Sequence, residues 1–155
     1  LTIDYQRDGE PGTAEVVTAA GEDGAPQLGV QVTEGFDTPF ELRIFLDEIG
    51  GPSAGLMFAL GIVDKLDPED LTGGLLIAGT GTIDELGNVG AIGGLPQKLA
   101  AARELGAAAF LVPAANCPTA VENAPPGMTL VRVEALAEAV DALAALRAGR
   151  QPPTC

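Results

Sequence analysis

The sequence has 155 residues, which favours one main folded domain. Its formal net charge of −14 makes binding to nucleic acid or to an anionic lipid surface unfavourable, because phosphate groups repel an acidic protein. Apolar residues make up 46% of the chain and aromatic residues only 4%, so we expect a core of Ala, Val, Leu and Ile.

The first third of the chain is predicted to be rich in strands. Residues 1–20 alternate around a turn-rich segment and predict a β-hairpin. Apolar residues also alternate over 25–35 and 39–46, which predicts further strands. Because Leu1 stands in the middle of a strand-like pattern, we expect the chain to be a fragment of a longer protein.

The remaining two thirds alternate between strand and helix patterns. Residues 52–66 carry apolar side chains at helical spacing, and Pro52 suits a first helical position. The elements expected after it are short glycine-broken strands over 73–94, a helix over 95–107, a strand over 108–113, a turn and strand over 123–133, and a helix over 134–149. This order predicts a mixed α/β or α+β domain.

The two cysteines, Cys117 and Cys155, stand 38 positions apart. They are either unrelated thiols or a disulfide that ties the C-terminal tail back over the last helix. We favour the disulfide, which would contribute about 4 kcal/mol of stability in the chain-entropy model and would indicate an oxidising compartment.

The composition excludes several kinds of site. The chain has no histidine, which removes a Ser-His-Asp triad, a Cys-His pair and every histidine metal site. It has no phosphate-binding loop, so ATP binding is not expected, and residues 79–87 lack the glycine spacing of a dinucleotide site. We therefore expect no metal and no cofactor.

The two lysines have opposite surroundings. Lys65 lies among aspartates and glutamates and is expected to be a solvated charge at a helix end. Lys98 is flanked by apolar residues and glycines and falls in the first turn of a predicted helix. Burial and the positive end of the helix dipole both disfavour its ammonium form, as a lysine general base requires. The alternative is a lysine that merely extends to the surface.

Ser53 is the only serine of the chain, and it lies in the segment "GGPSAG" at the start of a predicted helix. Free backbone N–H groups at a helix start can stabilise the oxyanion that forms when a serine hydroxyl attacks a carbonyl. Gly-Pro-Ser is also ordinary helix-start chemistry, so simple capping is the alternative. An apolar-flanked lysine in a chain without histidine favours a Ser–Lys nucleophile–base pair.

The segments "GGPSAG" and "GTGTIDELGNVGAIGGLPQKLAAARELGA" resemble the proteolytic domain of Lon-family serine peptidases over about residues 35–147. In that family a D-G-P-S-A-G motif holds the nucleophile, and the lysine of a G-G-x-x-x-K segment is the base. The resemblance assigns these roles to Ser53 and Lys98, which stand 45 positions apart. It places Thr80 where a threonine hydroxyl helps to hold the pair, although a plain turn threonine is the alternative.

Two departures from the family pattern refine this assignment. Gly50 stands where the family has an acid, so any gating or oxyanion role of that acid is missing. The ATPase module is absent from the segment, which is most similar to bacterial membrane-anchored PDZ–Lon proteins that lack this module. Residues 1–32 resemble the closing strands of a PDZ domain, and 33–155 the Lon-like peptidase domain. The implied location is the extracytoplasmic side of the cell membrane.

The resemblance implies an ATP-independent serine endopeptidase that cleaves unfolded or flexible protein segments through an acyl-enzyme. The backbone amides of Gly51, Ser53 and Ala54 are its candidate oxyanion donors. Its expected partners are protein or peptide substrates, and a homo-oligomer is compatible with the assignment. A catalytically silent Lon-like domain used for binding or assembly is the alternative. A carboxylate hydrolase that uses Asp47 or Glu48 is a more distant one.

Overall fold

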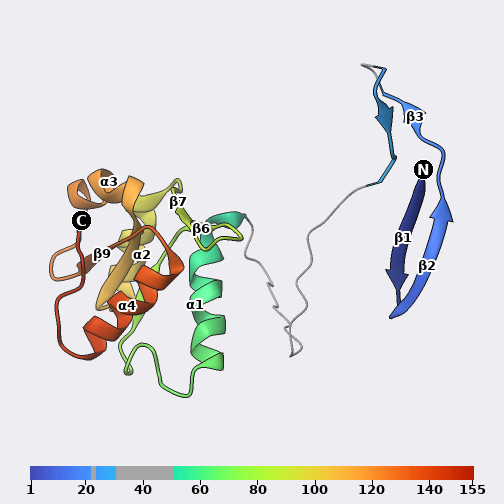
Figure 1. The fold of residues 1–155 in the computed structure, drawn as a ribbon. Helices are drawn as coiled ribbons and strands as arrows, with labels where there is room; N and C mark the ends of the chain where they lie inside the picture. The colour runs from blue at the N-terminus through green and yellow to red at the C-terminus, as the bar shows by residue number, and fades with distance from the viewer. Residues whose placement is uncertain (22–23, 31–50) are drawn as a thin grey trace. The chain divides into compact units, whose positions relative to one another are not determined.

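The computed structural model describes residues 1–21, 24–30 and 51–155 (Figure 1). The chain divides into two units, Leu1–Ile44 and Phe45–Cys155. The strand predicted over 39–46, the end of the one predicted over 25–35 and the expected boundary between 32 and 33 lie outside the described residues. Asp47, Glu48 and Gly50 lie outside them as well.

The first unit contains the predicted β-hairpin. In its antiparallel register Arg7 lies opposite Glu10, so Asp8 and Gly9 form a two-residue turn. Both turn residues have positive φ, 54° and 84°, which is the backbone of the turn that best matches strand twist in hairpins. The paired strands of this unit are β1 (Thr2–Arg7) with β2 (Glu10–Glu15) and β3 (Ala19–Ala20) with β4 (Pro26–Gln27).

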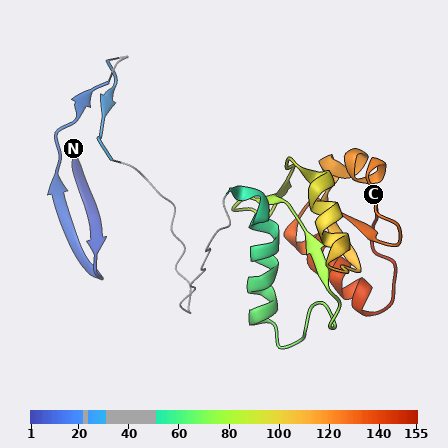
Figure 2. The same cartoon turned by 180° about the vertical axis from the view of Figure 1, so that it is seen from behind.

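The second unit is built around a parallel three-stranded sheet in the order β5-β8-β9 (Figures 1 and 2). A small antiparallel ribbon, β6–β7, precedes the helix α2. The strands of this unit are β5 (Ile77–Gly79), β6 (Thr82–Ile83), β7 (Val89–Gly90), β8 (Ala109–Pro113) and β9 (Thr129–Val133). The helices are η1 (Pro52–Ala54), α1 (Gly55–Leu66), α2 (Leu95–Glu104), η2 (Ala114–Asn116), α3 (Cys117–Glu122) and α4 (Leu136–Arg147).

Helices cover both faces of the parallel sheet. Successive side chains of a strand point to opposite faces, and the two apolar clusters follow this alternation. Ala109 and Leu111 of β8 pack in a cluster with α1 and α4, whereas Phe110 and Val112 pack in a second cluster with α2 and α3. All five residues of β8 are buried, as expected for a central parallel strand. The mixed α/β class predicted from the sequence is confirmed.

The segment after α4 returns to the sheet and runs beside β9. The Arg132 N–H donates to the Pro153 carbonyl over 3.1 Å, and the Cys155 N–H donates to the Leu130 carbonyl over 3.1 Å. A disulfide joins Cys155 to Cys117, the first residue of α3, with an S–S distance of 2.07 Å. The tail therefore forms a short antiparallel addition to the outer edge of β9. The sequence patterns predicted neither α3 nor the pairing of the tail with β9.

Candidate active site

Ser53 lies in the single turn of 3₁₀-helix, η1, that leads directly into α1. The residue before this turn, Gly51, has φ +84° and ψ 163°, an extended positive-φ conformation that is essentially restricted to glycine. Pro52 occupies the first position of the turn, where its missing N–H costs nothing. The glycine and proline of "GGPSAG" therefore set the backbone path that presents Ser53, whose side chain is partly buried.

The backbone of Ser53 is fastened to the segment that follows β5. Its carbonyl oxygen accepts two hydrogen bonds, one from the Gly81 N–H over 2.9 Å and one from the Thr80 hydroxyl over 2.8 Å. The Leu56 N–H in turn donates to the Gly81 carbonyl over 3.1 Å. The serine turn and the β5–β6 connection are thus held together by three hydrogen bonds.

Thr80 is the buried polar residue of this arrangement, with 2% of its surface exposed. It follows β5 directly, and its own N–H donates to the Leu111 carbonyl of the neighbouring strand over 3.2 Å. Its hydroxyl donates to the Ser53 carbonyl and accepts a hydrogen bond from Lys98 Nζ over 3.3 Å. Thr80 therefore contacts both of the residues that the sequence singles out.

Lys98 reaches Thr80 from the first turn of α2. That helix begins after Gly94, which adopts a left-handed conformation with φ +67°. The side chains of Leu95 and Leu99, one turn apart, are almost fully buried and hold the helix against the sheet. Lys98 is partly buried, and its Nζ donates to the threonine hydroxyl.

Three predicted site residues, Ser53, Thr80 and Lys98, thus come together at the starts of two helices and the end of one strand. Among the described residues, the hydrogen bonds that link them run through the Ser53 carbonyl oxygen rather than through its hydroxyl. Nucleophile–base contacts are often loose before substrate binds, so the arrangement is compatible with proton transfer between the two side chains.

The predicted oxyanion donors lie in and just before η1. The first N–H groups of a helix have no partner within that helix, which places the amides of Ser53 and Ala54 among the available donors. Pro52 has no N–H to offer, and the Gly55 N–H donates to the Pro52 carbonyl. The assignment of Gly51, Ser53 and Ala54 as oxyanion donors stays a prediction.

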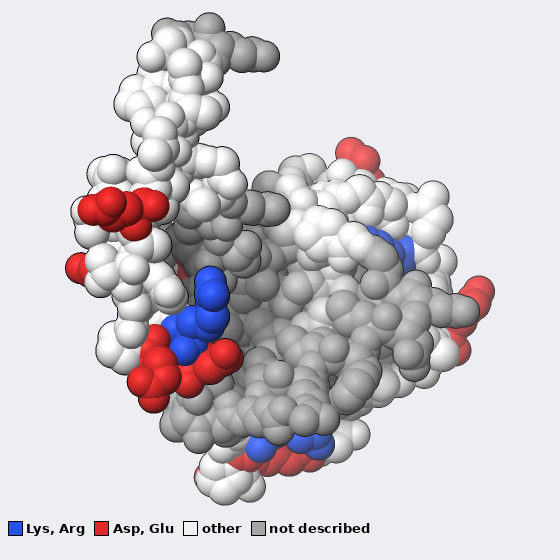
Figure 3. Space-filling model, turned by 90° about the vertical axis from the view of Figure 1, so that its right-hand side faces the viewer, with Lys and Arg blue, Asp and Glu red and all other residues white. Residues whose placement is uncertain are grey.

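The acidic side chains whose pKa values are shifted lie elsewhere. The Asn88 side chain, together with backbone N–H groups of the β6–β7 turn, lowers the pKa of Asp84. Hydrogen bonds from Thr72 and the following glycines lower the pKa of Asp70. Figure 3 shows that acidic side chains of the described residues are exposed on the face drawn there. Lys98 is the charged side chain that contacts the described part of the site.

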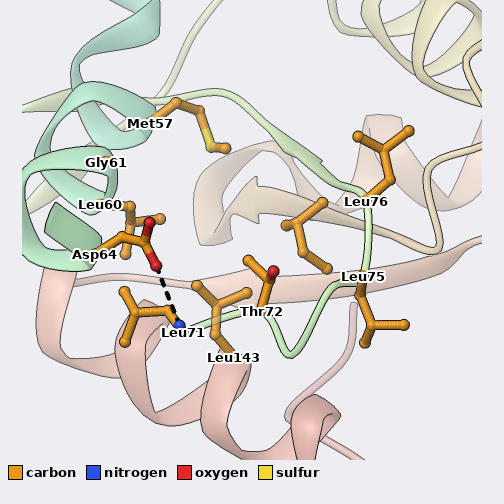
Figure 4. Close-up of a pocket in the computed structure, with 10 residues that line it drawn as sticks. Met57, Leu60, Gly61, Asp64, Leu71, Thr72, Leu75, Leu76 and Leu143 are labelled. Carbon is orange, nitrogen blue, oxygen red and sulfur yellow. Dashed lines mark hydrogen bonds between the residues drawn. The ribbon is translucent and has the colours of Figure 1, made fainter. Parts of the chain in front are cut away.

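An apolar pocket of about 250 Å³ lies beside α1 (Figure 4). Met57 and Leu60 of α1, Leu143 of α4 and the loop between α1 and β5 line it. The Asp64 carboxylate closes one side by accepting a hydrogen bond from the Leu71 N–H over 3.1 Å. None of Ser53, Thr80 and Lys98 lines this pocket, so it is separate from the candidate active site.

Within the described ranges, no group of three or more cysteine, aspartate and glutamate side chains is placed to hold a metal ion. The same residues include no helix of the length and apolarity that crossing a membrane requires.

Asn116 is a polar residue next to the site's scaffold that the sequence patterns missed. It ends η2, and both atoms of its side-chain amide bond to the backbone of Ile92, in the segment that leads into α2. A lone asparagine after a buried strand is common in turns, so nothing in the sequence distinguishes it.

The sequence of the second unit is matched by a known family. Residues 48–145 fit the model of the Lon protease (S16) C-terminal proteolytic domain, and the chain belongs to that family. The match includes Ser53, Thr80 and Lys98. One protein with a similar sequence is the Lon protease of Clostridioides difficile (strain 630), which is 36% identical over 94 residues. The aligned region covers 59% of this chain, and the chain spans only 12% of that relative's length.

Proposed function

We propose that this domain is a serine endopeptidase domain in which Ser53 is the nucleophile and Lys98 the general base. The observation that carries the proposal is the hydrogen-bonded connection from Lys98 Nζ through the Thr80 hydroxyl to the backbone of Ser53. Membership of the Lon proteolytic-domain family supports the same assignment. A buried threonine that contacts both residues fixes their separation more firmly than two exposed side chains could.

The proposed reaction begins with attack on the scissile peptide. The uncharged amine of Lys98 takes the proton of the Ser53 hydroxyl while Oγ bonds to the carbonyl carbon. The electron pair of the C=O bond moves to oxygen, and the amides of Gly51, Ser53 and Ala54 stabilise this oxyanion. The Lys98 ammonium, held by Thr80, gives its proton to the leaving nitrogen as the C–N bond breaks. Water then releases the acyl group, with Lys98 again acting as the base.

We further propose that the domain acts without ATP on unfolded or flexible protein segments. An extended substrate needs no unfolding before its backbone can approach the glycine-flanked turn at Ser53. A homo-oligomer of the domain is part of this proposal, and it is tested by light scattering across a range of protein concentrations.

The longer protein is proposed to combine a membrane anchor and a PDZ domain with this peptidase domain, on the extracytoplasmic side. The β1–β2 hairpin suits the closing strands of such a domain, and the Cys117–Cys155 disulfide suits an oxidising compartment. In intact cells that carry the full-length protein, a membrane-impermeant maleimide should label these cysteines after mild external reduction. Labelling only after cell lysis would contradict the location.

The peptidase proposal is tested by digestion of fluorescently labelled casein. The Ser53→Ala and Lys98→Ala variants should each lose at least about 1,000-fold in rate, as expected when members of one catalytic unit are removed. Lys65→Ala is the matched control, because Lys65 is an exposed lysine at the end of α1. Equal digestion by wild type and Ser53→Ala would refute the mechanism and favour a binding or assembly domain.

A further inference from the structure

The helix that carries Lys98 is entered through a short irregular segment. Residues 91–94 form no helix or strand, and the last two are glycines. A Cβ added at Gly93 would contact nothing within 4 Å, and one at Gly94 only the Gln97 side chain at 3.8 Å. Packing therefore does little to fix these two glycines, and the segment that leads into α2 depends on contacts made by its other residues.

The Asn116 side chain supplies such a contact. Its Oδ1 accepts a hydrogen bond from the Ile92 N–H over 2.9 Å, and its Nδ2 donates to the Ile92 carbonyl over 3.0 Å. One amide group thus satisfies both backbone groups of one residue, as a neighbouring strand would. The two residues are 24 positions apart, so the contact is tertiary.

Asn116 is itself held firmly. The turn η2 that it ends follows β8, whose residues are all buried. The next residue, Cys117, is joined to Cys155 by the disulfide. The disulfide and Ile92 both pack against the apolar cluster that contains Leu95 and Leu99. The asparagine therefore ties a glycine-rich segment to a turn that is held by a buried strand on one side and a disulfide on the other.

The position of Lys98 depends on this segment. The Lys98 N–H donates to the Gly94 carbonyl over 3.3 Å, so the first turn of α2 begins at the glycines. The Lys98 Nζ to Thr80 Oγ1 distance is also 3.3 Å, at the long end for a hydrogen bond. A shift of the helix start by about 1 Å would separate these two atoms, and misplacements of that size can cost about 100-fold in rate.

We propose that Asn116 is a positioning residue for Lys98. Its amide pair with Ile92 fixes the start of α2 and keeps Nζ at the Thr80 hydroxyl. The catalytic consequence rests on the proposed function, whereas the positioning itself does not.

The test compares Asn116→Ala with a matched control, Asn123→Ala. Asn123 also uses its side-chain amide on the backbone, donating to the Thr119 carbonyl over 2.9 Å at the exposed end of α3. Amide hydrogen exchange at Ile92 measures the contact directly. Modification by an amine-reactive acetylating reagent, resolved by mass spectrometry, measures the position of Lys98, and Lys65 in the same molecule is the internal reference.

In Asn116→Ala we expect exchange at Ile92 to rise at least tenfold and the Lys98 to Lys65 modification ratio to change at least threefold. For casein digestion, kcat should fall by about 10- to 100-fold while KM changes less than twofold, because positioning of the base is lost and substrate binding is kept. Asn123→Ala should leave all of these values at those of wild type.

An unchanged modification ratio in Asn116→Ala, or an equal change in Asn123→Ala, would overturn the proposal. If Asn116→Ala does not fold, Asn116→Asp is measured instead, since it keeps the acceptor for the Ile92 N–H and loses the donor; wild-type values in that variant would overturn it equally. If the wild-type domain digests nothing, the proposed function fails while the exchange and modification measurements still decide the role of Asn116.

Discussion

Lys98 Nζ donates a hydrogen bond to the hydroxyl of Thr80 over 3.3 Å, and that hydroxyl donates its own hydrogen to a different acceptor. The Thr80 O–H donates to the Ser53 carbonyl over 2.8 Å, which leaves its lone pairs for the lysine. The threonine therefore acts as an acceptor toward Lys98 Nζ, and its hydroxyl connects the lysine to the backbone of Ser53.

Replacing this hydroxyl should damage the site more than the fold. Thr80→Val keeps the shape of the side chain but removes the acceptor for Lys98 and one of the two donors to the Ser53 carbonyl. We expect casein digestion to fall at least about tenfold and the free energy of unfolding, measured in urea, to fall by about 1 kcal/mol. Thr80→Ser, which keeps the hydroxyl, should retain most of both; equal loss in the two variants would contradict this role.

Ser53→Ala should inactivate the domain without unfolding it. The hydrogen bonds that Ser53 makes to Thr80 and Gly81 use its backbone carbonyl, which alanine keeps. We expect the free energy of unfolding to change by less than about 0.5 kcal/mol. Thermal unfolding followed by circular dichroism measures this. A large loss of stability would show that the serine hydroxyl has a structural role instead.

Gly51→Ala should destabilise the turn that presents Ser53. A Cβ at this position would meet nothing within 4 Å, so the cost comes from the positive φ of 84° and amounts to about 1–3 kcal/mol. Gly61→Ala is the matched control, because a Cβ there also meets nothing within 4 Å while the residue lies in α1. That change should raise stability by about 0.5–1 kcal/mol. Urea titrations of the two variants should therefore shift in opposite directions.

Reduction of the disulfide should lower stability substantially. Cys117 and Cys155 close a loop with a sequence separation of 38, for which the chain-entropy model gives about 4 kcal/mol. Urea unfolding with and without reductant measures the difference. The Cys117→Ser, Cys155→Ser double variant should match the reduced wild type and should not respond to reductant. Equal stability of oxidised and reduced wild type would contradict the expectation.

The turn between β6 and β7 should make stability depend on pH in the acid range. Hydrogen bonds from Asn88 and the turn backbone lower the folded-state pKa of Asp84 below its ordinary value of 3.8. The stabilisation is therefore present above that value and is lost as the pH falls through the folded pKa. The difference in urea midpoint between wild type and Asp84→Ala should be larger at pH 7 than below pH 3. Leu86→Ala, in the same turn, removes no ionisable group and should show no such pH dependence.

Much of the second unit could be predicted from sequence periodicity. Apolar residues at helical spacing predict the helices α1 and α4, and an unbroken apolar run predicts the strand β8. These patterns are visible in the sequence because each element buries its own apolar side chains. The short helix α3 was missed because its six residues give too little periodic signal and follow a 3₁₀ turn directly.

Only part of the candidate site could be predicted from the sequence. Ser53 and Lys98 stand out as rare residues in unusual surroundings, and the family resemblance links them. That Thr80 contacts Lys98 through its side chain and Ser53 through its backbone is a tertiary fact which no spacing reveals. The contact of Asn116 with Ile92 is hidden in the same way, because neither residue belongs to a motif.

The pairing of the tail with β9 has a consequence for how copies of this domain can meet. An open strand edge invites another chain to extend the sheet, and proteins commonly block it with proline or a covering segment. Here residues 153–155 line β9, and Pro152 and Pro153 have no N–H groups. The disulfide between Cys117 and Cys155 secures this segment. The tail thus blocks extension of the sheet at the edge of β9, and breaking one sulfur–sulfur bond would loosen the tail from that edge.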